Sequence, residues 1–208
     1  MKSLIRNCLF GVLAFVTADS AIAATLPKSD QGCNPLSIGI EGYNYRYREP
    51  GLMKTKGYMY GLNGAYNVTF GSDFFFQPDF RIDYGRTDYK SYQTGSAKHF
   101  PNVLFETRII FGKRFCTSQD VQWDPYIGLG YRLKADDSGK LISTTGHSGY
   151  FRRSQYIYLP IGLTLHNRLC DGWSISPTVE FDCFLWGRQR SDLPGGSIHN
   201  KQKRGFGL

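Results

Sequence analysis

Acidic and basic side chains alternate with apolar ones in several segments of the chain. Asp79, Arg81 and Asp83 stand two residues apart inside an aromatic run, and Glu106 and Arg108 repeat the pattern. Guanidinium groups form forked hydrogen bonds to carboxylates in confined places. The predicted ion network comprises Glu41, Asp79, Arg81, Asp83, Glu106, Arg108, Arg132, Glu180 and Asp182. A purely structural role stays open beside a functional one, and structural networks are the commoner kind.

Two histidine–serine pairs could support acyl chemistry. His147 precedes Ser148, and Ser197 stands two residues before His199. A histidine base activates a serine only when it lies within hydrogen-bond reach and is itself oriented, which spacing cannot show. Loop serines and histidines are common without catalysis, so the sequence favours a non-enzymatic protein. His166 is interpreted as a hydrogen-bonded residue on a polar strand face.

These residues belong to segments with a period of two, which is typical of strands. Residues 58–70 and 73–84 each alternate an apolar or aromatic set with a small or polar set. The same alternation predicts strands at residues 103–115, 126–133, 156–166 and 173–186, a less regular strand at 36–47, and a last strand near 202–208. The sequence therefore predicts an all-β chain of eight strands.

The predicted connections alternate in length. Tight or short turns are expected at residues 71–72, 117–123 and 170–172, and long loops at 48–55, 86–101, 135–153 and 188–201. Long loops outside and short turns in the periplasm are typical of an outer-membrane barrel. Pro78, Pro160 and Pro177 fall inside predicted strands, where proline cannot donate to the ladder, so local bulges are expected.

The first residues have the pattern of a secretory signal. Lys2 and Arg6 precede an apolar run at residues 8–16, and Ala21-Ile-Ala23 is a small-x-small cleavage pattern. A membrane anchor is the alternative, but the run is shorter than the roughly 20 apolar residues that a spanning helix needs. We therefore expect residues 1–23 to be removed and residues 24–208 to form one barrel domain.

Composition narrows the partners. The 14 Tyr, 15 Phe and 24 Gly residues favour β-structure. The net charge of +8 favours anionic partners, but export and the lack of a compact basic–aromatic module argue against nucleic acid. The sequence leaves undecided whether a disulfide forms among Cys33, Cys116 and Cys170, while Cys183 is expected to stay unpaired. No cysteine pair has metal-ligand spacing, so neither metal nor cofactor is predicted.

Two kinds of barrel could carry this pattern. A soluble lipocalin-like barrel has an apolar interior, whereas a membrane barrel has an apolar exterior and a polar lumen. Strands of about ten residues, aromatic residues near the ends of the apolar faces, and mid-strand arginines favour the membrane barrel. Because eight strands enclose little more than side-chain width, the lumen is expected to be packed with ion pairs and tyrosines.

The signal, the eight alternating strands and the segment YLPIGLTL at residues 158–165 resemble small eight-stranded outer-membrane β-barrel proteins. These are the OmpA-like transmembrane barrels and the opacity-type surface antigens of Gram-negative bacteria. The resemblance covers essentially the whole mature chain and rests on pattern, without a diagnostic motif. It implies an eight-stranded antiparallel up-and-down transmembrane β-barrel in the cell outer membrane. Family members typically end in an aromatic residue, so the ending at Leu208 suggests a truncated strand eight.

The resemblance implies surface roles such as adhesion, envelope integrity or host-factor binding, and a monomer is expected. The basic residues singled out in the predicted loops are Lys98, Arg152, Arg153, Arg188 and Arg190. They could hold the phosphates of outer-membrane lipid and lipopolysaccharide, or other envelope or host ligands, or simply be attracted to an anionic leaflet. A lipid A-modifying enzyme and a small porin-like channel remain the alternatives.

Overall fold

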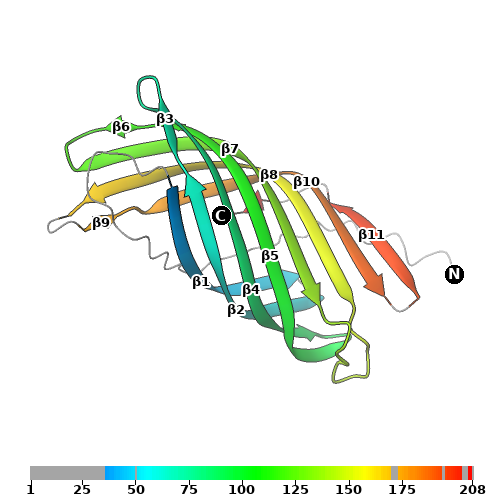
Figure 1. The fold of residues 1–208 in the computed structure, drawn as a ribbon. Helices are drawn as coiled ribbons and strands as arrows, with labels where there is room; N and C mark the ends of the chain where they lie inside the picture. Colours follow the sequence, from blue (N-terminus) through cyan, green and yellow to red (C-terminus); the bar gives the residue numbers. More distant parts are fainter. Residues whose placement is uncertain (1–35, 50, 170–172, 194, 203–205, 208) are drawn as a thin grey trace.

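The computed structural model describes residues 36–49, 51–169, 173–193, 195–202 and 206–207, all in strands, turns and loops (Figure 1). The predicted signal at residues 1–23 and the predicted turn at 170–172 lie outside the described residues. None of the described residues belongs to a helix long and apolar enough to span a membrane. The predicted all-β class is confirmed.

The strands form one antiparallel sheet in which each long strand pairs with the next in the chain. Its path is β1 (Leu36–Glu49), β2 (Met53–Tyr66), β4 (Phe74–Ser91), β5 (Gly95–Lys113), β7 (Val121–Asp137), β8 (Phe151–Arg168), β10 (Thr178–Leu193) and β11 (Gly196–Gln202). Eight consecutive up-and-down strands are thus confirmed. Among the described residues β1 does not pair with the last strands, so barrel closure is not observed.

Four short strands extend long ones. The strands β3 (Val68–Phe70), β6 (Phe115–Cys116), β9 (Ser174–Ile175) and β12 (Phe206–Gly207) pair with β4, β7, β8 and β10 respectively. The predicted last strand near 202–208 therefore begins earlier than expected, because β11 already pairs with β10 from Gly196. We call the end of the sheet with the turns β3–β4 and β6–β7 the turn end, and the opposite end the hairpin end.

Three of the four predicted long loops are wrong, because paired strands run through them. Pairing continues to Glu49↔Met53 between β1 and β2, to Ser91↔Gly95 between β4 and β5, and to Leu193↔Gly196 between β10 and β11. Only the connection between β7 and β8, residues 138–150, is a long loop as predicted. The sequence predicts loops where the alternation of apolar and polar residues stops. Backbone pairing continues beyond that point, because it does not require an apolar face.

The bulges expected at the prolines are also wrong. Opposite Pro78 the pairing of β4 stops after Ala65↔Asp79 and resumes at Val68↔Phe76 in an unchanged register. The ladder of β8 beside Pro160 shows a similar gap against β7, and Pro177 lies in the gap between β9 and β10. A missing N–H removes a ladder bond without inserting a residue, so the ladder is interrupted and the register is kept.

A real bulge lies where no proline stands. The register of β10 against β8 shifts between Phe184 and Trp186. In the sequence, Trp186 continues the even-numbered polar set that includes Glu180 and Asp182, which predicts the polar face. An extra residue reverses the side-chain alternation, so Trp186 points outward instead and is 43% exposed. Conversely, β1 is regular throughout: Ile38 and Ile40 lie on its exposed face, and Tyr43 and Tyr45 follow on the opposite one.

The two faces of the sheet have inverted polarity. The convex, outward face carries large exposed apolar residues such as Ile38 (64%) and Phe80 (50%), whereas Asp83 (0%) and Glu106 (2%) are buried on the other face. Side chains on that inner face meet across several strands, because Arg108 of β5 bonds Glu180 of β10. The sheet is therefore strongly curled and barrel-like (Figure 1).

Candidate functional site

Glu106 is the centre of the inner-face charges. Its carboxylate lies 2.6 Å from Nε of Arg81 and 2.5 Å from Nε of Arg132, and the Tyr158 hydroxyl donates to it at 2.5 Å. Strands β4, β5, β7 and β8 supply these four side chains. A buried carboxylate needs such donors because an unpaired charge away from water is costly.

A third arginine, Arg108, extends the network toward the turn end. Arg108 donates to both Asp79 carboxylate oxygens at 2.9 Å and to Glu180 at 2.8 Å. The Tyr126 hydroxyl donates to Glu180 at 2.6 Å. This is the forked geometry that makes arginine the preferred cation in confined sites.

The remaining members of the predicted network lie on the same face. Arg132 reaches Asp182 at 3.1 Å, and Arg81 lies 3.7 Å from Glu41. Asp83 accepts a hydrogen bond from the Tyr43 hydroxyl at 2.9 Å. The structure thus places all nine sequence-derived residues together on the inner face: Glu41, Asp79, Arg81, Asp83, Glu106, Arg108, Arg132, Glu180 and Asp182.

Glycines make room for the aromatic rings of this face. Tyr158 pairs across the ladder with Gly130, and Tyr126 pairs with Gly162. A Cβ built on either glycine would overlap the ring of its partner. An inner face of tyrosines therefore requires glycine on the neighbouring strand, an arrangement that the sequence analysis did not identify.

Toward the hairpin end the inner face is closed by a mixed apolar and charged cluster. Tyr45, Met59 and Leu104 form its buried core, and the Lys134 ammonium donates to the Tyr45 hydroxyl. Arg152 lies beside this cluster, over the ring of Tyr47, and the prediction that it faces outward from a loop is wrong. Predicted as an outward loop cation, it lies within β8, is only 8% exposed and contacts a carboxylate oxygen of Asp136 at 2.7 Å. Its place in the two-residue alternation turns it inward.

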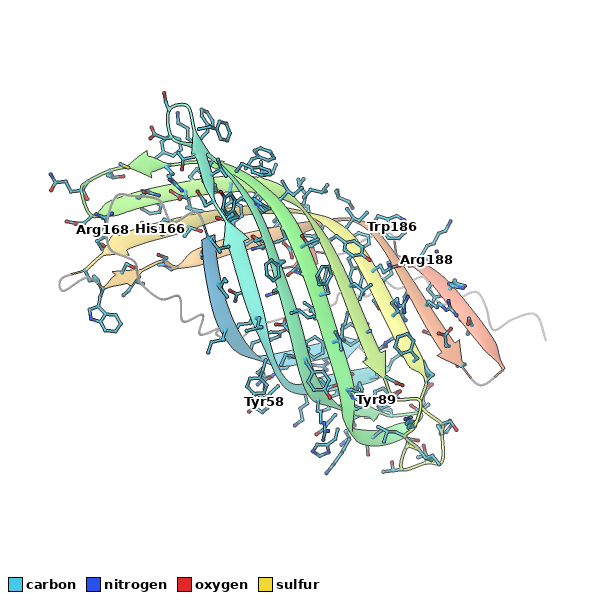
Figure 2. The ribbon with its side chains drawn as sticks, in the orientation of Figure 1. Tyr58, Tyr89, His166, Arg168, Trp186 and Arg188 are labelled. Atoms are coloured by element: carbon cyan, nitrogen blue, oxygen red, sulfur yellow. The ribbon has the colours of Figure 1, made fainter. Side chains whose placement is uncertain are left out.

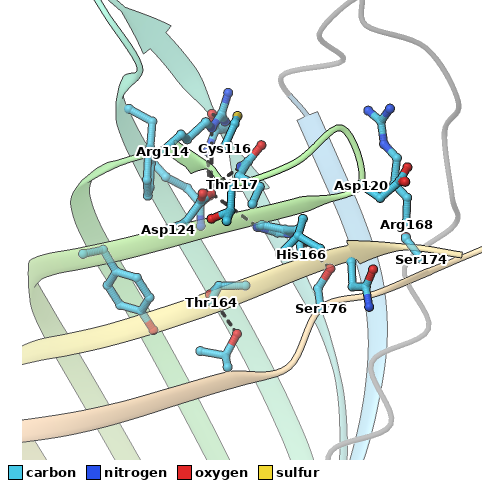
Figure 3. A pocket seen from close by; sticks show the side chains of 18 of the residues that line it. Arg114, Cys116, Thr117, Asp120, Asp124, Thr164, His166, Arg168, Ser174 and Ser176 are labelled. Carbon is cyan, nitrogen blue, oxygen red and sulfur yellow. Dashed lines mark hydrogen bonds and ion pairs between the residues drawn. The ribbon is translucent and has the colours of Figure 1, made fainter.

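The turn end is hollow. A cavity of about 1040 Å³ opens there, lined mostly by polar residues of strands from β4 to β10, with the apolar side chains of Phe75, Ile110 and Val121 among them (Figure 3). Within it, Nε2 of His166 lies 3.3 Å from Asp124, and Nδ1 lies 2.9 Å from the Ser176 hydroxyl. Asp124 also accepts from the Gln122 amide at 2.7 Å. His166 therefore has partners on both ring nitrogens, and the acid–histidine–hydroxyl order was missed because its members are far apart in sequence.

The two histidine–serine pairs named from sequence are engaged elsewhere. His147 Nδ1 lies 2.9 Å from the Thr145 hydroxyl, and His199 Nδ1 lies 3.2 Å from Arg188. Ser197 donates to Asp192 instead. No described hydrogen bond joins His147 to Ser148 or His199 to Ser197, so the structure offers no activated serine at the hairpin end among these residues.

The other four cations singled out from sequence lie on strands and are exposed: Lys98, Arg153, Arg188 and Arg190. Arg190 pairs with Asp192 at 2.7 Å. The Ser197 hydroxyl, followed by Arg190, holds the pKa of the Asp192 carboxyl below its usual range. Figure 2 shows Arg188 far from His166 and Arg168, which mark the turn end. These four cations thus lie on strands near the hairpin end and not in loops.

Two of the cysteines, Cys116 and Cys183, lie within the described residues. Cys116 is exposed at the end of β6, and Cys183 lies half-buried on the outward-facing side of β10. Cys33 and Cys170 lie outside the described residues, so the question of a disulfide among Cys33, Cys116 and Cys170 is untested.

Comparison with known proteins does not assign a family. No model of a known protein family matches the chain, and a search of curated proteins finds no significant match. Geometry and charge are therefore the basis for the function.

Proposed function

We propose that the curled sheet closes into an eight-stranded transmembrane barrel of the bacterial outer membrane, a non-enzymatic protein whose hairpins contact the envelope or host surface. One observation carries the proposal: the sheet is apolar outside and charged inside. Exposed rings such as Tyr60, Phe80 and Phe111 face outward. In water such a surface would be unfavourable, whereas in lipid it is the expected one.

The dimensions of the apolar surface support a membrane position. On β4, outward apolar residues run from Phe74 to Tyr84, about the length of a tilted membrane strand. Aromatic residues mark both ends of this stretch, as in interfacial girdles. Beyond Tyr84 the outward residues of β4 are polar or charged, so the hairpin end projects into water in this proposal.

The inner face supports a plugged barrel and not a channel. The ion network crosses its middle and leaves a cavity of about 200 Å³ beside Glu41, Arg81 and Arg108. The Tyr45, Met59 and Leu104 cluster packs the hairpin end. The cavity at the turn end is then a vestibule without an outlet. A small porin-like channel is correspondingly disfavoured, because eight strands leave space for little besides these side chains.

The direct test is heat modifiability after refolding in detergent. A folded barrel resists the denaturing detergent at room temperature and migrates differently from the boiled sample on a gel. We expect this shift together with fractionation into outer membranes. Unchanged migration accompanied by solubility without detergent would contradict the proposal and favour a soluble sheet protein.

A hydrolase is the second candidate, and one observation favours it. Ser176 is hydrogen-bonded to Nδ1 of His166, and Asp124 lies 3.3 Å from Nε2, so acid, histidine and hydroxyl stand in series as in serine hydrolases, with the two ring nitrogens exchanged. Against it, Ser176 is exposed to the wide cavity, so water is not excluded from the hydroxyl. Labelling by a fluorophosphonate that is lost in Ser176→Ala would establish this candidate, and absence of labelling would leave the non-enzymatic proposal.

A further inference from the structure

The outward faces of β1, β2 and β4 carry a dense group of cations at the hairpin end. We call it the basic wall, and it consists of Arg46, Arg48, Lys54, Lys56, Arg86 and Lys90. All six are exposed. Each has the same parity as the outward residues Tyr58, Tyr60 and Tyr84 below it, so all point away from the inner face.

The register places like charges directly against one another. Lys54 pairs with Arg48 on one side and with Lys90 on the other, so three cations share one row across three strands. In the next row Lys56 pairs with Arg46. Directly opposed like charges destabilise a sheet, and a fold selected for stability alone has no reason to build such rows.

Among the described residues, five of the six wall cations have no ion pair with an acid. Asp88 faces Lys56 across the ladder, but its carboxylate accepts the backbone N–H of His99 at 3.0 Å. No ion pair joins Arg48, Lys54, Lys56, Arg86 or Lys90 to a described carboxylate. The inner face differs, since Arg81, Arg108 and Arg132 are each paired there. The row of Arg48, Lys54 and Lys90 therefore has no ion-paired counter-charge among the described residues, and no acid stands opposite it on the ladder.

The position of the basic wall relative to the apolar surface indicates which anion supplies the counter-charge. Arg86 pairs across the ladder with Tyr58, which belongs to the aromatic belt at the apolar boundary. In the proposed barrel the wall then lies at headgroup level, immediately outside the acyl chains. Phosphate fits such a site, because arginine forks bind its oxygens in pairs and lysines supply point charge.

We infer that the basic wall is a binding site for the phosphate groups of the outer-leaflet glycolipid, a lipid A-type molecule. The inference rests on the proposed membrane barrel and names a lipid partner for one of its surfaces. The row of Arg48, Lys54 and Lys90 contacts phosphate, and the tyrosines below pack against the lipid. The exposed cations Arg188 and Arg190 of β10 form a weaker site, because Arg190 is already paired with Asp192.

The test compares two variants that each lose three exposed cations. One is Arg48→Gln/Lys54→Gln/Lys90→Gln, and the control is Lys98→Gln/Arg153→Gln/Lys201→Gln. Affinity for fluorescent bisphosphorylated lipid A is measured in detergent micelles with EDTA, so that divalent cations cannot bridge the phosphates. We expect the wall variant to lose about 100-fold in affinity and the control to stay within about threefold.

Three outcomes would overturn the inference. Equal losses in both variants would indicate attraction by net charge alone. Equal binding of dephosphorylated lipid A would exclude phosphate recognition, and full competition by millimolar inorganic phosphate would indicate a simple anion site. The heat-modifiable shift is measured for the unmodified protein and for each variant. Its absence in the unmodified protein would refute the barrel. Any of the three outcomes above in proteins that show the shift would refute only this site. If the triple variant does not fold, Lys54→Gln, the centre of the row, replaces it.

Discussion

At the residue scale, the inner face shows how charges are kept away from bulk water. Glu106 is only 2% exposed and has two guanidinium partners and one phenol partner. Burial of the carboxylate is tolerable because each donor replaces a hydrogen bond that water would have made. The partners come from strands on both sides of β5, so one residue fixes the positions of several neighbours.

Glu106→Gln is expected to destabilise the protein by about 3 kcal/mol, because it leaves Arg81 and Arg132 short of negative charge in a buried site. Urea unfolding in micelles, followed by tryptophan fluorescence, would measure the free energy of unfolding. The matched control is Asp192→Asn, a half-exposed acid bonded by Arg190 and Ser197 at the hairpin end, whose effect should be much smaller because solvent screens it. Equal effects of both changes would show that the network contributes no special stability.

At the element scale, the hairpins extend well past the apolar surface. β4 and β5 stay paired to Ser91 and Gly95, and Tyr92 between them is 91% exposed. The loop at 138–150 contacts this tip, since Thr144 N–H donates to the Ser96 carbonyl at 3.0 Å. Paired, cross-braced hairpins offer a more rigid contact surface than the loops expected from sequence.

This architecture predicts a sided labelling pattern. In variants without other cysteines, Tyr92→Cys should react with a membrane-impermeant maleimide on intact Gram-negative cells. Ser118→Cys, in the turn between β6 and β7, should react only after the outer membrane is permeabilised. The reverse pattern would invert the proposed orientation, and labelling of both sites on intact cells would argue against a membrane-spanning sheet.

At the scale of the whole molecule, the inner face is crossed by ion pairs in the middle, packed at the hairpin end, and hollow at the turn end. The cavity left in the middle, about 200 Å³, is much smaller than the one at the turn end. We therefore expect the refolded protein to show no steady open steps in planar bilayers. The same preparation must show the heat-modifiable shift, so that silence is not caused by misfolding. Stable conductance steps would require the ion network to leave a continuous water path, and would favour the channel.

Sequence alone predicted much of the strand content and of the inner face. The alternation in residues 73–84 places Phe74, Phe80 and Ile82 outside and Asp79, Arg81 and Asp83 inside, as observed. This succeeds because successive strand side chains point to opposite faces, which is a local property of the backbone. It fails at Trp186, since a bulge reverses the alternation and leaves no mark in the residue types.

What the sequence determined by itself is therefore the strand type, the two faces and the set of charged residues on the inner one. Only the tertiary structure decided that Arg152 turns inward, that the hairpins replace loops, that Ser176 meets His166, and that Lys54 stands between Arg48 and Lys90. These features depend on register and on contacts between distant strands. Backbone pairing sets both the register and these contacts. It continues along two neighbouring strands whether or not apolar and polar residues alternate in them.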